Sequence, residues 1–113
     1  MSKNNTPINE VDSTMIERLK ALLSEHVGKE NPITSAQVAS FLKIEEDDTH
    51  AKTRALIREC VQKYDLPLAA GNRGYYIITS QNEYNEYIAN LDSRIAGIEE
   101  RKGIVTKNFN RKK

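Results

Sequence analysis

The sequence predicts an α+β fold in which three helices precede a β-hairpin and a long helix follows it. Apolar residues recur every three to four positions as far as Tyr64, and the period shortens to about two between Leu66 and Thr79. Three of the segments open with threonine or serine and carry glutamate or glutamine three residues later, which is the pattern of a capping box. With 113 residues, 38% of them hydrophobic, the chain suits one domain with extensions.

Composition divides the chain into four predicted parts. Residues 1–13 are polar and are expected to form a flexible N-terminal segment, and residues 14–79 hold the core. Residues 80–108 are expected to form a C-terminal dimerisation helix, and residues 109–113 a basic tail. The net charge is only +1, but residues 49–74 carry +3 and residues 101–113 carry +6, so positive charge gathers in two places.

The first two helices are predicted from caps and apolar stripes. Helix one is expected to begin at the capping box of Thr14 and to stop at Gly28. Helix two is expected to begin at Thr34, with Gln37 completing its box. The expected buried residues are Ile16, Leu19, Leu22, Leu23 and Val27 in the first helix and Val38, Phe41 and Leu42 in the second.

Helix three is predicted from about His50 to Tyr64, with Thr49 as its cap. Its inner stripe is Thr53, Leu56, Ile57, Cys60, Val61 and Tyr64. The acidic residues 45–48 precede it and would repel phosphate. Carboxylates at this place can complement the positive end of helix three, which explains Asp47 and Asp48 better than it explains all four acidic residues. The alternative function of the run is to bind a basic protein surface.

A two-stranded hairpin follows, with Leu66-Pro67-Leu68 and residues 75–79 as its strands. Pro67 has no N–H to donate, so its strand is expected at an edge or only partly paired. Residues 71–74 form the loop, in which the glycines permit a tight turn and Asn72 is expected to tolerate a positive φ.

The last helix is predicted from the capping box at Ser80 to about Asn108 and carries a heptad repeat. This 3.5-residue repeat predicts a homodimer, and Arg94 is placed to pair with Glu99 of a parallel partner. Gly97, Gly103 and Lys102 weaken the repeat beyond Ile98, and packing on the chain's own core must take part of the stripe. The expected dimerisation residues are Tyr84, Ile88, Leu91, Ile95 and Ile98.

From "ITSAQVASFL" through "THAKTRALIRECVQKYDLPLAAGNRGYYI" the chain resembles the small winged helix-turn-helix proteins of bacteriophages and prophages. The shared features are an arginine-bearing third helix, a proline in the strand that follows it, a short wing and then Gly-Tyr-Tyr. The resemblance implies a winged helix-turn-helix that binds DNA as a transcriptional or replication regulator. Thr53 stands where such proteins carry valine, and it is expected to weaken the core slightly.

Binding to double-stranded DNA assigns roles to particular side chains. His50, Lys52, Arg54 and Arg58 are expected to face the major groove from helix three, since arginine bonds guanine and lysine favours phosphate. Asn72 and Arg73 are expected to hold the flanking groove from the wing tip. The alternative for the helix-three residues is that they form a charged, solvated helix face without a ligand. The alternative for Asn72 and Arg73 is that they form a soluble turn, and the basic tail could serve only to increase solubility.

Other classes of function are poorly supported. There is no P-loop or paired Cys/His spacing, so no enzyme activity, small-molecule substrate, cofactor or metal is predicted, and Cys60 is expected to be a buried thiol. No apolar run suits a membrane span or a secretory signal, so the expected location is the cytoplasm. The rival prediction is a module that binds a host protein through residues 45–48 and the last helix.

Overall fold

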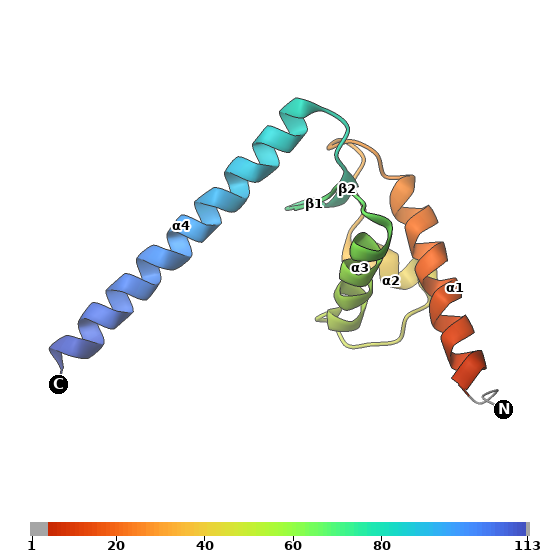
Figure 1. The fold of residues 1–113 in the computed structure, drawn as a ribbon, viewed down its shortest axis with the longest axis horizontal. Coiled ribbons are helices and arrows are strands. Elements are labelled where there is room, and N and C mark those ends of the chain that lie inside the picture. Colours follow the sequence, from red (N-terminus) through yellow and green to blue (C-terminus); the bar gives the residue numbers. More distant parts are fainter. Residues whose placement is uncertain (1–4, 113) are drawn as a thin grey trace. The chain divides into compact units, whose positions relative to one another are not determined.

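The computed structural model describes the backbone of residues 5–112 and the side chains of residues 14–112. Over that range the chain forms four helices and one antiparallel hairpin, which confirms the α+β class (Figure 1). It divides into two compact units, Met1–Thr79 and Ser80–Lys113. The elements are α1 (Asn5–Ser24), α2 (Ser35–Leu42), α3 (Ala51–Tyr64), β1 (Leu68–Gly71), β2 (Gly74–Ile77) and α4 (Gln81–Arg111).

Helix α1 differs from its predicted bounds at both ends. It begins at Asn5, so Thr14 lies inside the helix and the predicted start there is wrong. Pro7 falls in the first turn, where its missing N–H removes no intrahelical hydrogen bond. Of the segment predicted to be flexible, residues 5–13 are therefore helical and residues 1–4 lie outside the described range. The helix ends at Ser24, before Gly28, although Gly28 has the expected positive φ, 90°.

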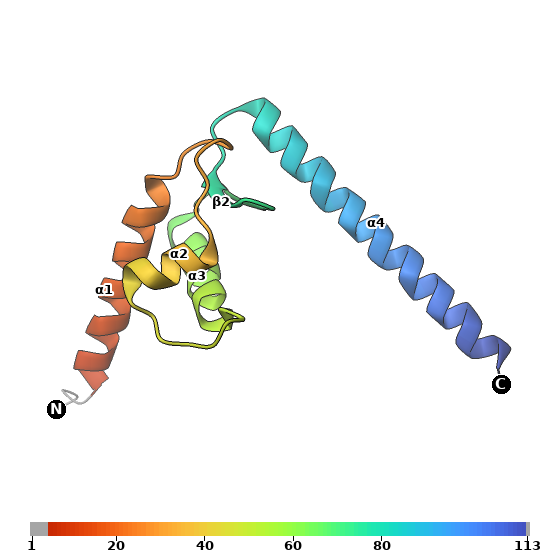
Figure 2. The ribbon, with the colours of Figure 1, turned by 180° about the vertical axis from the view of Figure 1, so that it is seen from behind.

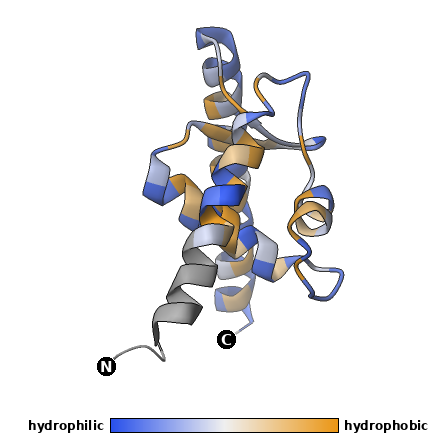
Figure 3. Cartoon of the chain, turned by 90° about the vertical axis from the view of Figure 1, so that its right-hand side faces the viewer, coloured by the Kyte–Doolittle hydropathy of each residue, from blue (hydrophilic) through white to orange (hydrophobic). Residues whose placement is uncertain are grey.

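Helices α1, α2 and α3 build one core. Leu19 and Leu23 of α1, Val38 of α2 and Cys60 of α3 are completely buried. Each large apolar side chain removed from water in this way contributes about 1.5–3 kcal/mol. Figure 3 shows hydrophobic and hydrophilic residues following one another along the helices, as expected when one face of each is buried. Because the inner face of α3 is used in this core, its outer face stays available.

Helix α2 begins as predicted. The Thr34 hydroxyl accepts from the amide of Gln37 at 3.1 Å, and the Gln37 side chain accepts from the Thr34 amide at 2.9 Å. The prediction that Phe41 is buried is wrong, since 59% of its surface is exposed. The helix is only eight residues long, and it turns Val38 and Leu42 inward, which leaves Phe41 on its outer side.

The hairpin is confirmed, but both strands are displaced from their predicted bounds: β1 begins at Leu68 and extends to Gly71, and β2 begins at Gly74 and ends at Ile77. Leu68 pairs with Ile77 and Gly71 with Gly74, so the turn consists of Asn72 and Arg73. Among the described residues Asn72 is not one of those with a positive φ, so that expectation is wrong; Gly74 takes the unusual conformation instead, with a φ of 128°.

The second strand also pairs with the connection between α1 and α2. The Ile33 amide donates to the carbonyl of Tyr75 at 2.9 Å, and the Tyr75 amide donates to the carbonyl of Ile33 at 2.7 Å. A Cβ on Gly74 would lie 2.5 Å from the Ile33 carbonyl oxygen, so only glycine allows this approach. The hairpin is thereby fastened to the three-helix core.

Helix α4 makes up most of the second unit. Ser80 caps it as predicted, because its hydroxyl accepts from the Glu83 amide at 3.1 Å. The helix has 31 residues and ends at Arg111, so it continues past the predicted end at Asn108 and takes in most of the predicted basic tail. None of its residues is buried.

Candidate nucleic-acid interface

The start of α3 is held by Glu46, a residue that the sequence analysis did not assign to the cap. Its Oε1 accepts from the backbone amides of Lys52 at 2.8 Å and Thr53 at 3.1 Å. These amides belong to the first turn, where no carbonyl of the helix can reach them. The predicted cap Thr49 is wrong: its hydroxyl donates to Asp47 at 2.5 Å instead. His50 is the N-cap residue by position, with a left-handed φ of 56° and no side-chain cap bond.

Glu46 is also tied to side chains behind the helix start. The Thr53 hydroxyl donates to Glu46 Oε2, and His50 Nδ1 lies 3.3 Å from the same oxygen. Desolvation by itself raises the pKa of Glu46, but the hydrogen bonds from Thr53, His50 and Lys52 outweigh it and leave the pKa below its ordinary value. The carboxylate is therefore kept ionised where the helix dipole favours negative charge.

This geometry corrects one interpretation from the sequence and adds a hydrogen-bond partner for Thr53. Glu46, and not Asp47 or Asp48, supplies the carboxylate that binds the first turn of α3. Thr53 is completely buried, and its hydroxyl has a partner in Glu46, so this threonine links the acidic run to the helix and its own polar atom is not left unpaired. The sequence signal that could have predicted this contact was a threonine at a core position with a glutamate seven residues before it.

The outer face of α3 carries small residues first and long donors after them. Ala51, Ala55, Arg58 and Gln62 follow one another at intervals of four, three and four and are all exposed. A helix with its side chains is about 10–12 Å across, close to the roughly 12 Å width of the major groove. Alanines at the front of this face therefore let the backbone come near base edges, and Arg58 and Gln62 have the donors to reach them.

Gln62 was missed by the sequence analysis, although it lies one helical turn beyond Arg58 and glutamine bonds adenine in two places. The interval of four between the two residues was the signal that could have found it. Within the described residues, no hydrogen bond or ion pair holds the Arg58 guanidinium.

The other predicted residues of α3 lie around this face. Lys52 and Arg54 are exposed on its two sides. The Arg54 Nη1 donates to the carbonyl of Thr49 at 2.6 Å, so part of this guanidinium is engaged within the chain. The His50 side chain is 28% exposed and directed at Glu46, so it belongs to the helix start in this structure.

The turn of the hairpin forms a second exposed cluster. Asn72 and Arg73 are both exposed at its tip, and the Arg73 Nη1 lies 3.7 Å from Glu30 Oε1. Both side chains of this ion pair are largely in water, where such pairs contribute little. Figures 1 and 2 show the hairpin near the C-terminal end of α3, the end that carries Arg58 and Gln62. The structure thus keeps the predicted residues in two clusters on one unit.

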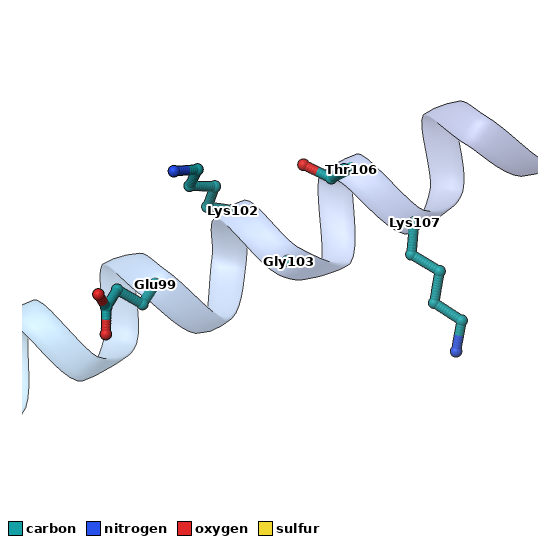
Figure 4. A pocket seen from close by; sticks show the side chains of 5 residues that line it. All are labelled: Glu99, Lys102, Gly103, Thr106 and Lys107. Atoms are coloured by element: carbon teal, nitrogen blue, oxygen red, sulfur yellow. The ribbon is translucent and has the colours of Figure 1, made fainter.

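Other kinds of site are poorly represented in residues 14–112. That range contains no group of three His, Cys, Asp or Glu side chains arranged for a metal ion. A shallow depression on α4 is lined by Glu99, Lys102, Gly103, Thr106 and Lys107, and Figure 4 shows these residues along that one helix. All five come from one helix, so the depression has no opposite wall to enclose a ligand.

Cys60 is completely buried and desolvation raises the pKa of its thiol, which keeps it protonated. Helices long and apolar enough to cross a membrane do not occur in the described part of the chain. The chain matches no protein-family model, and comparisons with curated proteins and with solved structures find no match.

Proposed function

We propose that the protein is a winged helix-turn-helix that binds double-stranded DNA sequence-specifically, as a homodimer, and regulates transcription or replication. In this proposal α2 and α3 are the helix-turn-helix, and β1 and β2 are the wing. Helix α3 lies in the major groove, and Arg73 contacts the flanking phosphates or minor groove. The proposal also places the protein in the cytoplasm.

The outer face of α3 carries this proposal. Ala51 and Ala55 lie in the N-terminal half of this face, and Arg58 and Gln62 lie in its C-terminal half. Arginine and glutamine are the residue types that bond guanine and adenine, respectively. Lys52 and Arg54 flank the face, where a groove-bound helix meets the two phosphate strands. A helix face selected only for solubility has no need of small residues at one end and long hydrogen-bond donors at the other.

The acidic run opposes DNA binding less than its charge suggests. Glu46 and Asp47 have their carboxylates in hydrogen bonds with the start of α3 and with Thr49. The charge of Glu46 is thereby used at the positive end of the α3 dipole, and the Asp47 carboxylate is used in the turn before the helix. Glu45 and Asp48 remain exposed and still repel phosphate. Salt screens this repulsion, so the expected decrease of binding with salt comes from the lysine and arginine side chains that contact phosphates.

The rival function is a module that binds a host protein through residues 45–48 and the last helix. The same geometry weakens the part of this hypothesis that depends on residues 45–48. Two of the four carboxylates offered to a basic partner are already used within the chain. The exposed apolar face of α4 is the observation that favours the rival, since such faces take up partner helices. A protein partner would leave binding to DNA absent, so one assay separates the two functions.

Fluorescence anisotropy of the full chain with mixed-sequence duplex DNA, at low and at moderate salt, tests the proposal. We expect binding that falls with salt by a slope of several phosphates. Arg58→Ala should weaken binding to a selected site by about 1–3 kcal/mol. Arg18→Ala is the matched control, because it removes the same charge from an exposed position on α1.

Two results would count against DNA recognition by α3. No binding at low salt would leave the rival as the better function. Equal losses for Arg58→Ala and Arg18→Ala would mean that only total charge matters and that α3 does not read the groove.

A further inference from the structure

We infer that a second copy of this chain covers the apolar face of α4, in a parallel and in-register two-stranded coiled coil. This inference deepens the homodimer part of the proposed function and does not depend on DNA binding. It gives the dimer an interface and an orientation.

The apolar face of α4 follows the heptad repeat. Positions a are Ile88, Ile95, Lys102 and Phe109, and positions d are Tyr84, Leu91, Ile98 and Val105. Five of these side chains have about half or more of their surface exposed: Tyr84 49%, Ile95 56%, Ile98 57%, Val105 60% and Phe109 65%. An apolar seam, interrupted at Lys102, thus runs along one side of the helix, and most of its side chains lack cover.

The size of the seam suits a second helix. With 31 residues, α4 is about 46 Å long at 1.5 Å per residue. The five exposed side chains offer on the order of 600 Å², approaching the ~800 Å² that each partner buries in a standard interface. Ile88 at a with Leu91 at d favours two strands. Ile95 and Ile98 do not share this pattern, so the choice of two strands depends on the Ile88–Leu91 layer and on the charged Lys102 at position a.

A helix of this kind needs such cover. Gly97 and Gly103 each destabilise a helix interior by about 1 kcal/mol relative to alanine, and a Cβ added at either position would meet nothing within 4 Å. Neither glycine is therefore explained by close packing inside the chain. Long helices in water draw most of their stability from packing of an apolar face. A second copy supplies that packing.

The charges beside the seam select the orientation. Arg94 and Arg101 lie at positions g, and Asp92 and Glu99 lie at positions e. A parallel pair places Arg94 of one copy beside Glu99 of the other, twice by symmetry. An antiparallel pair brings g beside g and e beside e, which opposes like charges. Arg94 Nε donates to Asn90 Oδ1 at 3.0 Å, which holds its side chain along the helix and leaves its terminal nitrogens for the partner.

A parallel coil has a consequence for the proposed function. Both copies of α4 start at the same end, so both winged units attach there. Two copies of α3 related by a two-fold axis suit a palindromic site with half-sites one helical turn, or a multiple of it, apart.

Light scattering on the full chain without DNA tests the oligomer. We expect the wild-type chain and Ser93→Asp to have twice the chain mass, because Ser93 lies at an outer f position, and Ile95→Asp to have the mass of one chain. A monomeric wild type at all accessible concentrations, a trimer or tetramer, or a dimer that persists in Ile95→Asp would overturn the inference. A monomer that still binds DNA would leave the α3 proposal intact.

Disulfide trapping tests the orientation. Val105→Cys places a thiol at a d position toward one end of α4, where only a parallel pair brings the two copies within the ~7 Å between Cα atoms that a disulfide allows. Cys60 is completely buried, so under native conditions the introduced thiol reacts and Cys60 does not compete with it. We expect Val105→Cys to cross-link with itself on mild oxidation and the b-position control Ala96→Cys to remain uncross-linked. A dimer in which Val105→Cys fails to cross-link would overturn the parallel arrangement.

Discussion

Replacing Gly74 with alanine tests how the hairpin is fastened to the core. A Cβ at this position would lie 2.5 Å from the Ile33 carbonyl oxygen and 2.6 Å from its carbon, and both atoms belong to rigid backbone. The φ of Gly74, 128°, is also a conformation that residues with a side chain rarely adopt. The substitution must therefore either strain this turn or separate β2 from Ile33.

The cost follows from these contacts. Separation breaks the two backbone hydrogen bonds between Ile33 and Tyr75, each of which contributes about 0.5–1.5 kcal/mol. A non-glycine residue in such a backbone conformation costs about 1–3 kcal/mol. We expect Gly74→Ala to lower the free energy of unfolding by about 1–3 kcal/mol, because either route costs about that much, which corresponds to a decrease in Tm of roughly 5 °C or more for a unit of this size.

Gly71→Ala is the matched control from the same turn. The nearest atom to its added Cβ is the Gly74 carbonyl oxygen at 3.9 Å, an ordinary contact, and Gly71 has no positive φ. Its free energy of unfolding should change by no more than about 0.5 kcal/mol.

Urea unfolding followed by circular dichroism compares the two variants, and hydrogen exchange of the Tyr75 amide reports the local contact. Equal unfolding midpoints, with unchanged exchange at Tyr75, would refute the role given to Gly74.

Three further predictions concern the start of α3 and the wing. Glu46→Gln should lower stability at about pH 7 and have a diminishing effect below about pH 4.5. A carboxyl whose pKa is lowered by folding stabilises the fold above its ordinary pKa and loses that contribution as the pH falls through the folded value. Urea unfolding at several pH values checks this, and an equal effect for the exposed control Glu45→Gln would contradict it. Thr53→Val should lower Tm in spite of its greater hydrophobicity, because Glu46 loses a hydrogen bond, and a higher Tm would show that the hydroxyl is dispensable. Glu30→Gln should strengthen DNA binding slightly at low salt, because it frees Arg73 from its ion pair. Glu17→Gln on α1 is the control, since it removes the same charge away from the wing. Equal effects of both variants in anisotropy would mean that the ion pair does not affect DNA binding.

Local chemistry made several features predictable. Thr34 and Ser80 cap their helices as expected, because a hydroxyl that accepts from an amide three residues later is a contact within one turn. The hairpin was predictable from its change of period and its glycines. The inner stripe of α3 was also correct for Thr53, Ile57 and Cys60, which are all buried.

The wrong predictions fall where local rules compete. The pattern at Thr14 resembles a helix start, but the residues before it are compatible with helix as well, so α1 begins at Asn5. Phe41 is as apolar as its neighbours, yet the short α2 directs Val38 and Leu42 into the core and leaves Phe41 outside. Hydrophobicity alone does not tell which side of a two-turn helix faces its neighbours.

The sequence by itself determined the order of the elements, two of the helix caps and the heptad repeat of α4, since each depends on residues that are close in the chain. Only the tertiary structure decided that Glu46 caps α3, that Thr53 gives it a buried partner and that Ile33 pairs with Tyr75 across Gly74. These contacts join residues from six to about forty positions apart. Their geometry depends on how the helices pack, because packing decides which distant polar groups come within hydrogen-bonding distance.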